Sequence, residues 1–218
     1  MMQVTGNKSL KKQNILSIRL SPSGLYFSIN DKKPRWIEDK LILKEKGRLT
    51  QILEENKLSE DNFSRVSVGL CTKDTVLIPS EHSSIIEDLN PKEGYKIIEA
   101  MPCAGIIEII YMPKHIKSAL KEFYADKVNY VSSLLRIRAQ SNKKTYSLAV
   151  YGDMCSLVAS EGAKVLMAQN LPCQNYADIV YYMSVFESES KANLELVFDS
   201  TGGLYKQIKA HYKKIKNR

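Results

Sequence analysis

The histidines and cysteines are the residues of this chain best suited to metal binding or nucleophilic chemistry. They are His82, His115 and His211, and Cys71, Cys103, Cys155 and Cys173. No histidine has a second ligand at metal-binding spacing, and no two cysteines form a CxxC pair, so the sequence predicts neither a zinc site nor a dithiol redox site. It also contains no Walker loop, HExxH helix or GxSxG elbow. We expect histidines at the solvated surface, buried reduced thiols, no metal ligands and no catalytic residues.

Lysines recur at helical spacing near the end of the chain. A helix is predicted over Leu204–Lys216. Its apolar face is Leu204, Ile208, Tyr212 and Ile215, and its basic face is Lys206, Lys209, Lys213 and Lys216. A basic amphipathic helix can bind an anionic surface or an acidic partner. The alternative, which we favour, is a terminal helix that docks by its apolar face and leaves its lysines in water.

The positive charge of the chain is concentrated at its two ends. The 218 residues carry a formal net charge of +8, yet residues 1–19 and 206–218 hold basic residues and no acid, while the segment between them has slightly more acids than bases. Nucleic acid is therefore an unexpected partner, because attraction to phosphates would depend on the ends alone. No stretch reaches the roughly 20 apolar residues of a membrane-spanning helix. No secretion signal is visible either, so we expect a cytoplasmic protein.

Alternating apolar residues and turn signals predict two α/β halves. The second half reads as three strands, a helix, a strand and a helix, and the first half is a looser version of that order. Because the polar segment Arg136–Lys144 separates the halves, we expect a flexible basic N-terminus at 1–14, a first lobe at 15–140 and a second lobe at 141–218 that ends in the basic helix. The predicted strands are Ile15–Leu20, Leu25–Ile29, one within Arg35–Leu43, Arg65–Leu70, Thr75–Ile78, Tyr95–Ala100, Ile106–Tyr111, Val128–Val131, Thr145–Tyr151, Met154–Ala159, Lys164–Ala168 and Leu194–Phe198.

This order of elements resembles that of a known family. The residues that carry the resemblance are Leu16–Ile29, Val76–Glu81, Tyr146–Ala168 and Phe198–Tyr205. Together they are similar to a family of uncharacterised bacterial proteins with the actin-like ATPase fold, and distantly similar to the actin-like protein of type IV pilus assembly. The resemblance implies an α/β fold of two ribonuclease-H-like lobes, each with a mixed sheet flanked by helices.

The resemblance also implies three turns where that fold would hold ATP. The first phosphate loop normally supplies an acid that orients metal and water, then small residues whose N–H groups face phosphate. Here Leu20–Gly24 offers no acid, and Pro22 has no N–H. The second loop, Tyr151–Cys155, offers one glycine and an acid displaced into the turn. Only Gly202 and Gly203 match, at the turn that receives adenosine. We expect no ATP turnover, and an adenine nucleotide would make at most a weak contact there.

Three hypotheses on function follow. The first is a non-catalytic actin-like cytosolic protein that acts as an interaction module for a protein partner. The second is an ATP-binding switch or ATPase of the same fold with unusual loops. The third is a binder of anionic surfaces, membrane or nucleic acid, through the basic C-terminal helix. The first is favoured because both loops that would perform the chemistry lack the necessary groups.

Two aromatic features each allow two interpretations. Trp36, the only tryptophan, lies in a predicted edge strand, as either an exposed partner contact or a core anchor. Tyr181 and Tyr182 could form a binding platform, but their place on a predicted helix favours half-buried packing with the hydroxyls at the rim.

Overall fold

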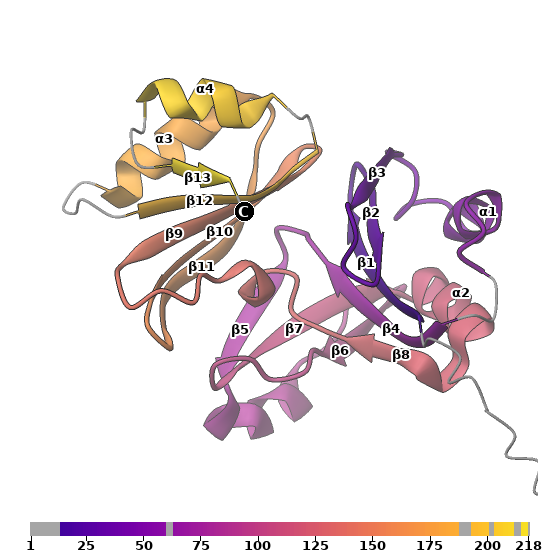
Figure 1. Cartoon of the computed structure of the whole chain (residues 1–218). Helices are drawn as coiled ribbons and strands as arrows, with labels where there is room; N and C mark the ends of the chain where they lie inside the picture. The colour runs from indigo at the N-terminus through magenta and orange to yellow at the C-terminus, as the bar shows by residue number, and fades with distance from the viewer. Residues whose placement is uncertain (1–13, 60–62, 188–192, 201–202, 212–214, 218) are drawn as a thin grey trace, which may run out of the picture.

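The computed structural model describes residues 14–59, 63–187, 193–200, 203–211 and 215–217 (Figure 1). These residues form two five-stranded sheets and one three-stranded sheet. The predicted flexible N-terminus, residues 1–14, lies outside the described residues except for Asn14, which is the first residue of β1.

The first large sheet contains strands from the first half of the chain and is covered by two helices. The elements are β1 (Asn14–Ser21), β2 (Gly24–Ile29), β3 (Arg35–Glu38), β4 (Phe63–Leu70) and β8 (Val128–Tyr130), with α1 (Arg48–Glu55) and α2 (Lys114–Tyr124). The spatial order is β3-β2-β1-β4-β8. β1, β2 and β3 form an antiparallel meander, and β4 and β8 extend the sheet with parallel pairing.

The second large sheet repeats this plan. Its elements are β9 (Thr145–Tyr151), β10 (Met154–Glu161), β11 (Lys164–Pro172), β12 (Asn193–Asp199) and β13 (Ile215–Asn217), with α3 (Tyr176–Glu187) and α4 (Leu204–His211). The spatial order is β11-β10-β9-β12-β13, again an antiparallel meander followed by two parallel pairings. The same order and directions in both sheets confirm the predicted architecture of two similar α/β units. The exact boundary at residues 140–141 stays a prediction.

A smaller sheet lies between β4 and α2 in the chain. Its strands are β5 (Thr75–Pro79), β6 (Tyr95–Glu99) and β7 (Ile106–Pro113), in the order β5-β7-β6 with antiparallel pairing. Short 3-10 helices complete the structure: η1 (Ser80–Asp88), η2 (Ala125–Lys127) and η3 (Leu135–Ile137). Within the described residues, no helix has the length and apolar character needed to span a membrane.

Each large sheet buries one face against its own pair of helices. The first core includes Ile18, Leu20, Leu53, Ile116 and Leu120, and the second includes Leu148, Leu157, Ile179, Met183 and Ile208. Burying a side chain of this kind contributes about 1.5–3 kcal/mol. Ile208 is fully buried, so the expectation that the last helix docks on the protein is confirmed.

The other face of the second sheet packs against the first half of the chain. Ala149 and Tyr151 of β9 form a buried apolar cluster with Cys71 and Leu134. β9 is therefore buried on both faces, and every one of its residues is buried. This arrangement places the β9–β10 turn next to the first half of the chain.

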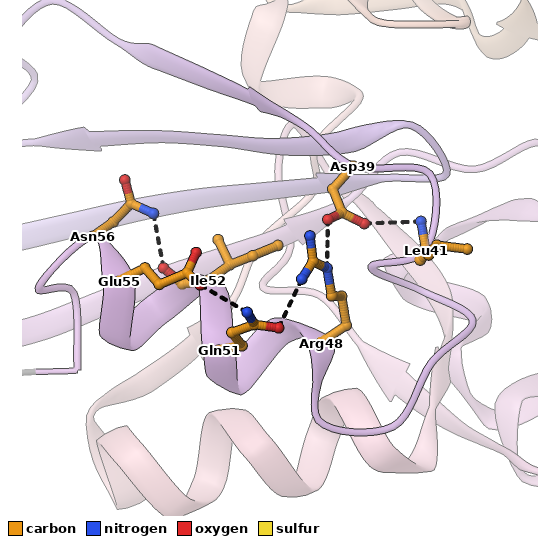
Figure 2. Close-up of polar contacts among 7 residues, drawn as sticks. All are labelled: Asp39, Leu41, Arg48, Gln51, Ile52, Glu55 and Asn56. Atoms are coloured by element: carbon orange, nitrogen blue, oxygen red, sulfur yellow. Dashed lines mark hydrogen bonds and ion pairs between the residues drawn. The ribbon is translucent and has the colours of Figure 1, made fainter.

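The strand predicted within Arg35–Leu43 is β3, and it ends at Glu38. Figure 2 shows the cause. The Asp39 carboxylate accepts hydrogen bonds from the Leu41 N–H at 2.9 Å and from Nε of Arg48 at 2.6 Å. These contacts turn the chain away from the sheet and tie the end of β3 to the start of α1. The Asp39 N–H also donates to the Ser23 carbonyl at 2.8 Å, so the same residue holds the β1–β2 turn.

The end of the chain corrects the predicted helix Leu204–Lys216. α4 ends at His211, and residues 215–217 form β13. Ile215 pairs with Leu194 and Asn217 with Leu196, which gives β12 a second parallel neighbour. The fifth strand satisfies backbone groups of β12 that a longer helix would leave unpaired, and it occupies the place that β8 has in the first sheet.

Candidate functional site

Two turns from opposite halves of the chain lie in direct contact. The first loop, Ser21–Gly24, joins β1 to β2, and the second loop, Tyr151–Met154, joins β9 to β10. The Ser23 hydroxyl donates a hydrogen bond to the Tyr151 carbonyl at 3.1 Å and accepts one from the Asp153 N–H at 3.2 Å. A single serine side chain therefore bonds the first loop to two backbone groups of the second.

The N–H groups at the tip of the second loop are bonded to serine hydroxyls. Gly152 N–H donates to the Ser200 hydroxyl at 2.8 Å, and Asp153 N–H donates to Ser23. Ser200 follows β12 and is held in place by a bond from its own N–H to the Val150 carbonyl at 3.1 Å. In a phosphate-binding loop such N–H groups face the anion. Here the protein itself occupies them.

Glycine permits this close approach of the two loops. Gly152 has a φ of +65°, and a Cβ there would overlap the Ser23 hydroxyl oxygen and lie 2.7 Å from the Ser23 Cβ. A Cβ on Gly24 would overlap the Ile37 carbonyl oxygen and lie 2.8 Å from Cζ2 of Trp36. The space that each glycine opens is filled by protein atoms, so neither glycine leaves room for a ligand.

Trp36 lies against both loops. It pairs with Tyr26 across β2 and β3 and is half-buried. A Cβ added to Gly24 would lie 2.8 Å from the Cζ2 atom of Trp36, and a Cβ added to Gly152 would lie 3.1 Å from the same atom. Of the two interpretations left open by the sequence, this geometry favours the core anchor.

An aromatic cluster joins the two large sheets beside the loops. Tyr26 of β2 meets Phe198 of β12 edge-to-face, with ring centroids 4.6 Å apart, and meets Tyr151 of β9 at 5.9 Å. Tyr151 and Phe198 stack at 5.2 Å. Burial raises the pKa of the Tyr151 hydroxyl, which keeps it neutral. Pairs of this kind add about 0.5–1.5 kcal/mol each beyond the area that they bury, so the cluster reinforces the loop contact.

Arg19 and Glu108 are buried ionisable side chains in the first half of the chain. Burial lowers the pKa of Arg19, whose guanidinium donates to the Ile18 carbonyl at 2.7 Å. Burial raises the pKa of Glu108 on β7 to about 7, although hydrogen bonds from the Ser132 hydroxyl and the Leu134 N–H favour its charged form. Glu108 thus connects the small sheet to the segment after β8 by hydrogen bonds, and its role is structural.

A groove of about 310 Å³ remains beside the loops. Its lining includes two carboxylates, Glu38 and Asp153, and one lysine, Lys40. A nucleoside triphosphate placed there would face two negative groups and second-loop N–H groups that are already bonded. The residues present do not fit the phosphate chain of ATP. Across the described part of the chain, no three His, Cys, Asp or Glu side chains are placed to hold a metal ion.

The other potentially reactive side chains are the histidines and cysteines, and among them the side chain of His211 lies outside the described residues. Cys71, Cys155 and Cys173 are buried as expected, and Cys103 is partly buried. Burial raises the pKa of Cys71 to about 12 and that of Cys173 to about 11, which favours the protonated thiol at neutral pH. His82 is exposed, as predicted. His115 is half-buried and burial lowers its pKa, which corrects the expected surface position.

The predicted basic face does not lie on one helix. Lys206 and Lys209 are exposed on α4, Lys213 lies outside the described residues, and Lys216 is in β13. Of the predicted adenosine turn, Gly202 lies outside the described residues and Gly203 directly precedes α4. Binding of adenine nucleotide or of an anionic surface at these residues stays a prediction.

The tyrosine pair on α3 is only partly packed, which corrects the favoured interpretation. Tyr182 is half-buried and its hydroxyl donates to the Pro172 carbonyl at 3.0 Å, as expected of packing at a rim. Tyr181 is 63% exposed, because it points away from the buried side of the helix defined by Ile179 and Met183.

Three residues of the loop junction carry no sequence signal for their role. Ser23 and Ser200 bond the second loop, and Phe198 stacks on Tyr151, yet each is an ordinary residue of a turn or a strand end. The only sequence sign of the junction is negative: the first loop lacks an acid and contains Pro22. A serine at the tip of such a turn becomes meaningful only when the opposing loop is known.

The sequence matches a protein family across nearly its whole length. The family is described as "Protein of unknown function (DUF3822)", and the match covers residues 5–217. No curated protein matches the sequence.

Several solved structures resemble this fold. A Bacteroides thetaiotaomicron protein with an actin-like ATPase fold and unknown function is 19% identical, with a TM-score of 0.67 over 95% of this chain and 91% of that one. A PilM–PilN type IV pilus biogenesis complex gives 12% identity and a TM-score of 0.55, and the match covers 94% of this chain and 88% of that one. The cytoplasmic domain of EpsL, an inner-membrane component of the Vibrio cholerae type II secretion system, gives 11% identity and a TM-score of 0.51. The match covers 86% of this chain and 83% of that one. These likenesses show the actin-like ATPase fold that the sequence predicted.

Proposed function

The chain belongs to the DUF3822 family and has the actin-like ATPase fold, and we propose that it is a non-catalytic member of this fold that works by binding a protein partner. The observation that carries the proposal is the bond of Ser23 to both the Tyr151 carbonyl and the Asp153 N–H. Where an ATPase of this architecture needs a gap lined with N–H groups, the two loops are bonded to each other.

Binding of ATP between the loops would require the protein to give up hydrogen bonds that it already makes. To bind a triphosphate between the loops, the protein would have to break the bonds of Ser23 and Ser200 to the second loop and displace Trp36 from the glycines. Each hydrogen bond contributes about 1 kcal/mol net, and a donor or acceptor left without a partner costs more. The first loop has no acid with which to position a metal ion and water. The hydrogen bonds that would be lost disfavour ATP binding, and the missing acid disfavours ATP turnover.

The named neighbours support a role in protein assembly. One solved neighbour is a PilM–PilN complex of type IV pilus biogenesis, and another is a component of a type II secretion system. We propose that the fold serves in this chain, too, as a platform that binds another protein. We propose a cytoplasmic location for this module.

Calorimetric titration with Mg-ATP, followed by measurement of phosphate release over hours, tests the proposal. We expect no binding at micromolar nucleotide and no release above background. Adenosine in place of ATP tests the weaker contact predicted at Gly202 and Gly203.

Micromolar binding of Mg-ATP would overturn the argument from the loops. Hydrolysis lost in Asp153→Ala and retained in Asp126→Ala, an exposed acid on the other half of the chain, would move the protein into the ATPase class.

A further inference from the structure

The three-stranded sheet has one face that η1 covers only in part. Val76 of β5 pairs with Ile109 of β7, and Tyr95 of β6 pairs with Pro113 of β7. Paired residues, and residues an even number of positions apart in one strand, share a face, so these four side chains lie on the same side of the sheet. There Ile109 packs with Ile86 of η1 in a buried cluster. The covered region ends near Ile109, because Val76 and Tyr95 are each 37% exposed.

A cavity of about 330 Å³, here called the small-sheet cavity, lies at this end of the face. Val76, Tyr95 and Tyr111 line it from the small sheet. Leu43, from the segment between β3 and α1, and Leu70, at the end of β4, line it from the first half of the large-sheet core. Its volume and its largely apolar and aromatic lining are typical of small-molecule sites. The cavity can therefore hold an apolar or aromatic group of a ligand.

Two exposed side chains of opposite charge also line the small-sheet cavity. Asp74 lies in the loop between β4 and β5, and Lys92 lies in the loop between η1 and β6. The Asp74 Oδ2 and Lys92 Nζ atoms are 3.8 Å apart, and the two side chains are 54% and 76% exposed. An ion pair this exposed contributes little to stability, so its exchange for the charges of a ligand costs little. Asp74 can receive an ammonium group, and Lys92 can receive a carboxylate.

Hydrogen bonds hold the two loops that carry these charges. In the turn before β5, the Thr75 hydroxyl donates to the Thr72 carbonyl at 2.9 Å and accepts a bond from the Asn170 side chain at 2.8 Å. In the other loop, the Tyr95 N–H donates to the Lys92 carbonyl at 3.1 Å. Because the backbone of each loop is tied down, a ligand needs only side-chain movements to reach both charges, which limits the entropic cost of binding.

We propose that the small-sheet cavity binds a free α-amino acid that has an apolar or aromatic side chain. The ammonium group of the ligand pairs with Asp74, its carboxylate pairs with Lys92, and its side chain enters the space beside Val76 and Tyr111. An α-amino acid carries both charges on one carbon atom, and this close spacing suits two protein charges 3.8 Å apart. The inference goes beyond the proposed binding of a protein partner and does not depend on it.

The pair of charges distinguishes this ligand from two others that could fill the apolar space. An internal segment of a protein chain carries no charge on its backbone, so it would leave Asp74 and Lys92 without a role. An apolar carboxylic acid, such as a fatty acid, would pair with Lys92 and bring a like charge close to Asp74. A zwitterion with an apolar side chain satisfies both charges as well as the apolar lining.

Isothermal titration calorimetry of the full-length protein tests the proposal, with L-leucine, L-methionine, L-phenylalanine and L-tryptophan as ligands. The N-acetyl derivative of the amino acid that binds most tightly lacks the ammonium charge, and its amide lacks the carboxylate. A leucine tripeptide with both ends blocked represents an internal protein segment. The protein variants are Asp74→Asn and Lys92→Gln, and the matched controls Asp126→Asn and Lys121→Gln replace exposed residues that do not line the cavity. Because all four replaced side chains are exposed, the variants should keep the fold, which thermal unfolding checks.

We expect saturable binding of at least one of the four amino acids at or below millimolar concentration. Removing either charge of the ligand should weaken this binding by about fivefold or more, and so should Asp74→Asn or Lys92→Gln. The variants Asp126→Asn and Lys121→Gln should bind like the wild type. The proposal would be overturned if none of the four amino acids bound, if the N-acetyl or amide derivative or the blocked tripeptide bound equally well, or if Asp74→Asn and Lys92→Gln kept full affinity. Mg-ATP calorimetry on the same preparation reports separately on the proposed function, so the two can fail independently.

Discussion

Replacing Gly152 by alanine should destabilise the protein far more than the same change at a comparable turn glycine. At Gly152 the backbone φ is +65°, and an added Cβ would overlap the Ser23 hydroxyl and lie 2.7 Å from the Ser23 Cβ. At Gly162, in the β10–β11 turn, φ is +58°, and the nearest atom to an added Cβ is Oδ1 of Asn142 at 4.0 Å. The two sites share the backbone conformation and differ in the contact between the loops.

Three contributions determine how much each variant lowers the free energy of unfolding. Alanine in a left-handed conformation costs about 1 kcal/mol at either site. At Gly152 alone, overpacking adds about 1–3 kcal/mol, and loss of the Ser23 bond to the second loop adds about 1 kcal/mol. Gly152→Ala should therefore lower the free energy of unfolding by about 3–5 kcal/mol, against about 1 kcal/mol for Gly162→Ala.

Urea unfolding followed by the emission of Trp36, the single tryptophan of the chain, measures both variants. In a Ser23→Gly background, the added cost of Gly152→Ala should shrink toward that of Gly162→Ala, because the overlapping side chain is gone. Equal costs for the two glycine variants in the wild-type background would refute the contact between the loops.

Three further predictions concern the elements around the site. Ile208→Ala should cost about 2–5 kcal/mol by thermal or urea unfolding because Ile208 is fully buried, whereas the exposed Lys206→Ala should stay within about 0.5 kcal/mol. Because burial raises the pKa of Glu108 to about 7, the folded protein holds a proton that the unfolded chain releases above about pH 4.5. Stability should thus fall as pH rises through that window, by up to about 3 kcal/mol, and Glu108→Gln should flatten the fall. Asn175→Ala should cost about 1 kcal/mol, because the Asn175 side chain accepts hydrogen bonds from the N–H groups of Ala177 and Asp178 at the start of α3, and Asn175→Ser should restore most of it.

The fold was largely predictable because its signals are local. The meander from Thr145 to Pro172 is marked by apolar strands and by turn residues at Gly152 and Gly162, which need no knowledge of distant partners. β13 was missed because it is three residues long and its strand state comes from pairing with β12. The order of the first half offered a clue, since β8 follows α2 as β13 follows α4.

The site was predictable only in what its loops lack. An acid-free turn with Pro22 and a second loop with one glycine gave the expectation of no ATP turnover. The contact itself joins Ser23 to Tyr151, which are 128 residues apart, and depends on how the two halves pack. Exposure of Tyr181 was missed for a related reason, because the helical pattern shows which residues are apolar and not which face the sheet buries.

The emission of Trp36 during titration with Mg-ATP tests the central claim most directly. The side chain lies against both loops, so any opening that admits a nucleotide must move it. With the loops bonded to each other, the emission maximum and intensity should stay constant up to millimolar Mg-ATP, and free Mg²⁺ should give the same result. A saturable change with a micromolar midpoint, absent with free Mg²⁺, would contradict the account.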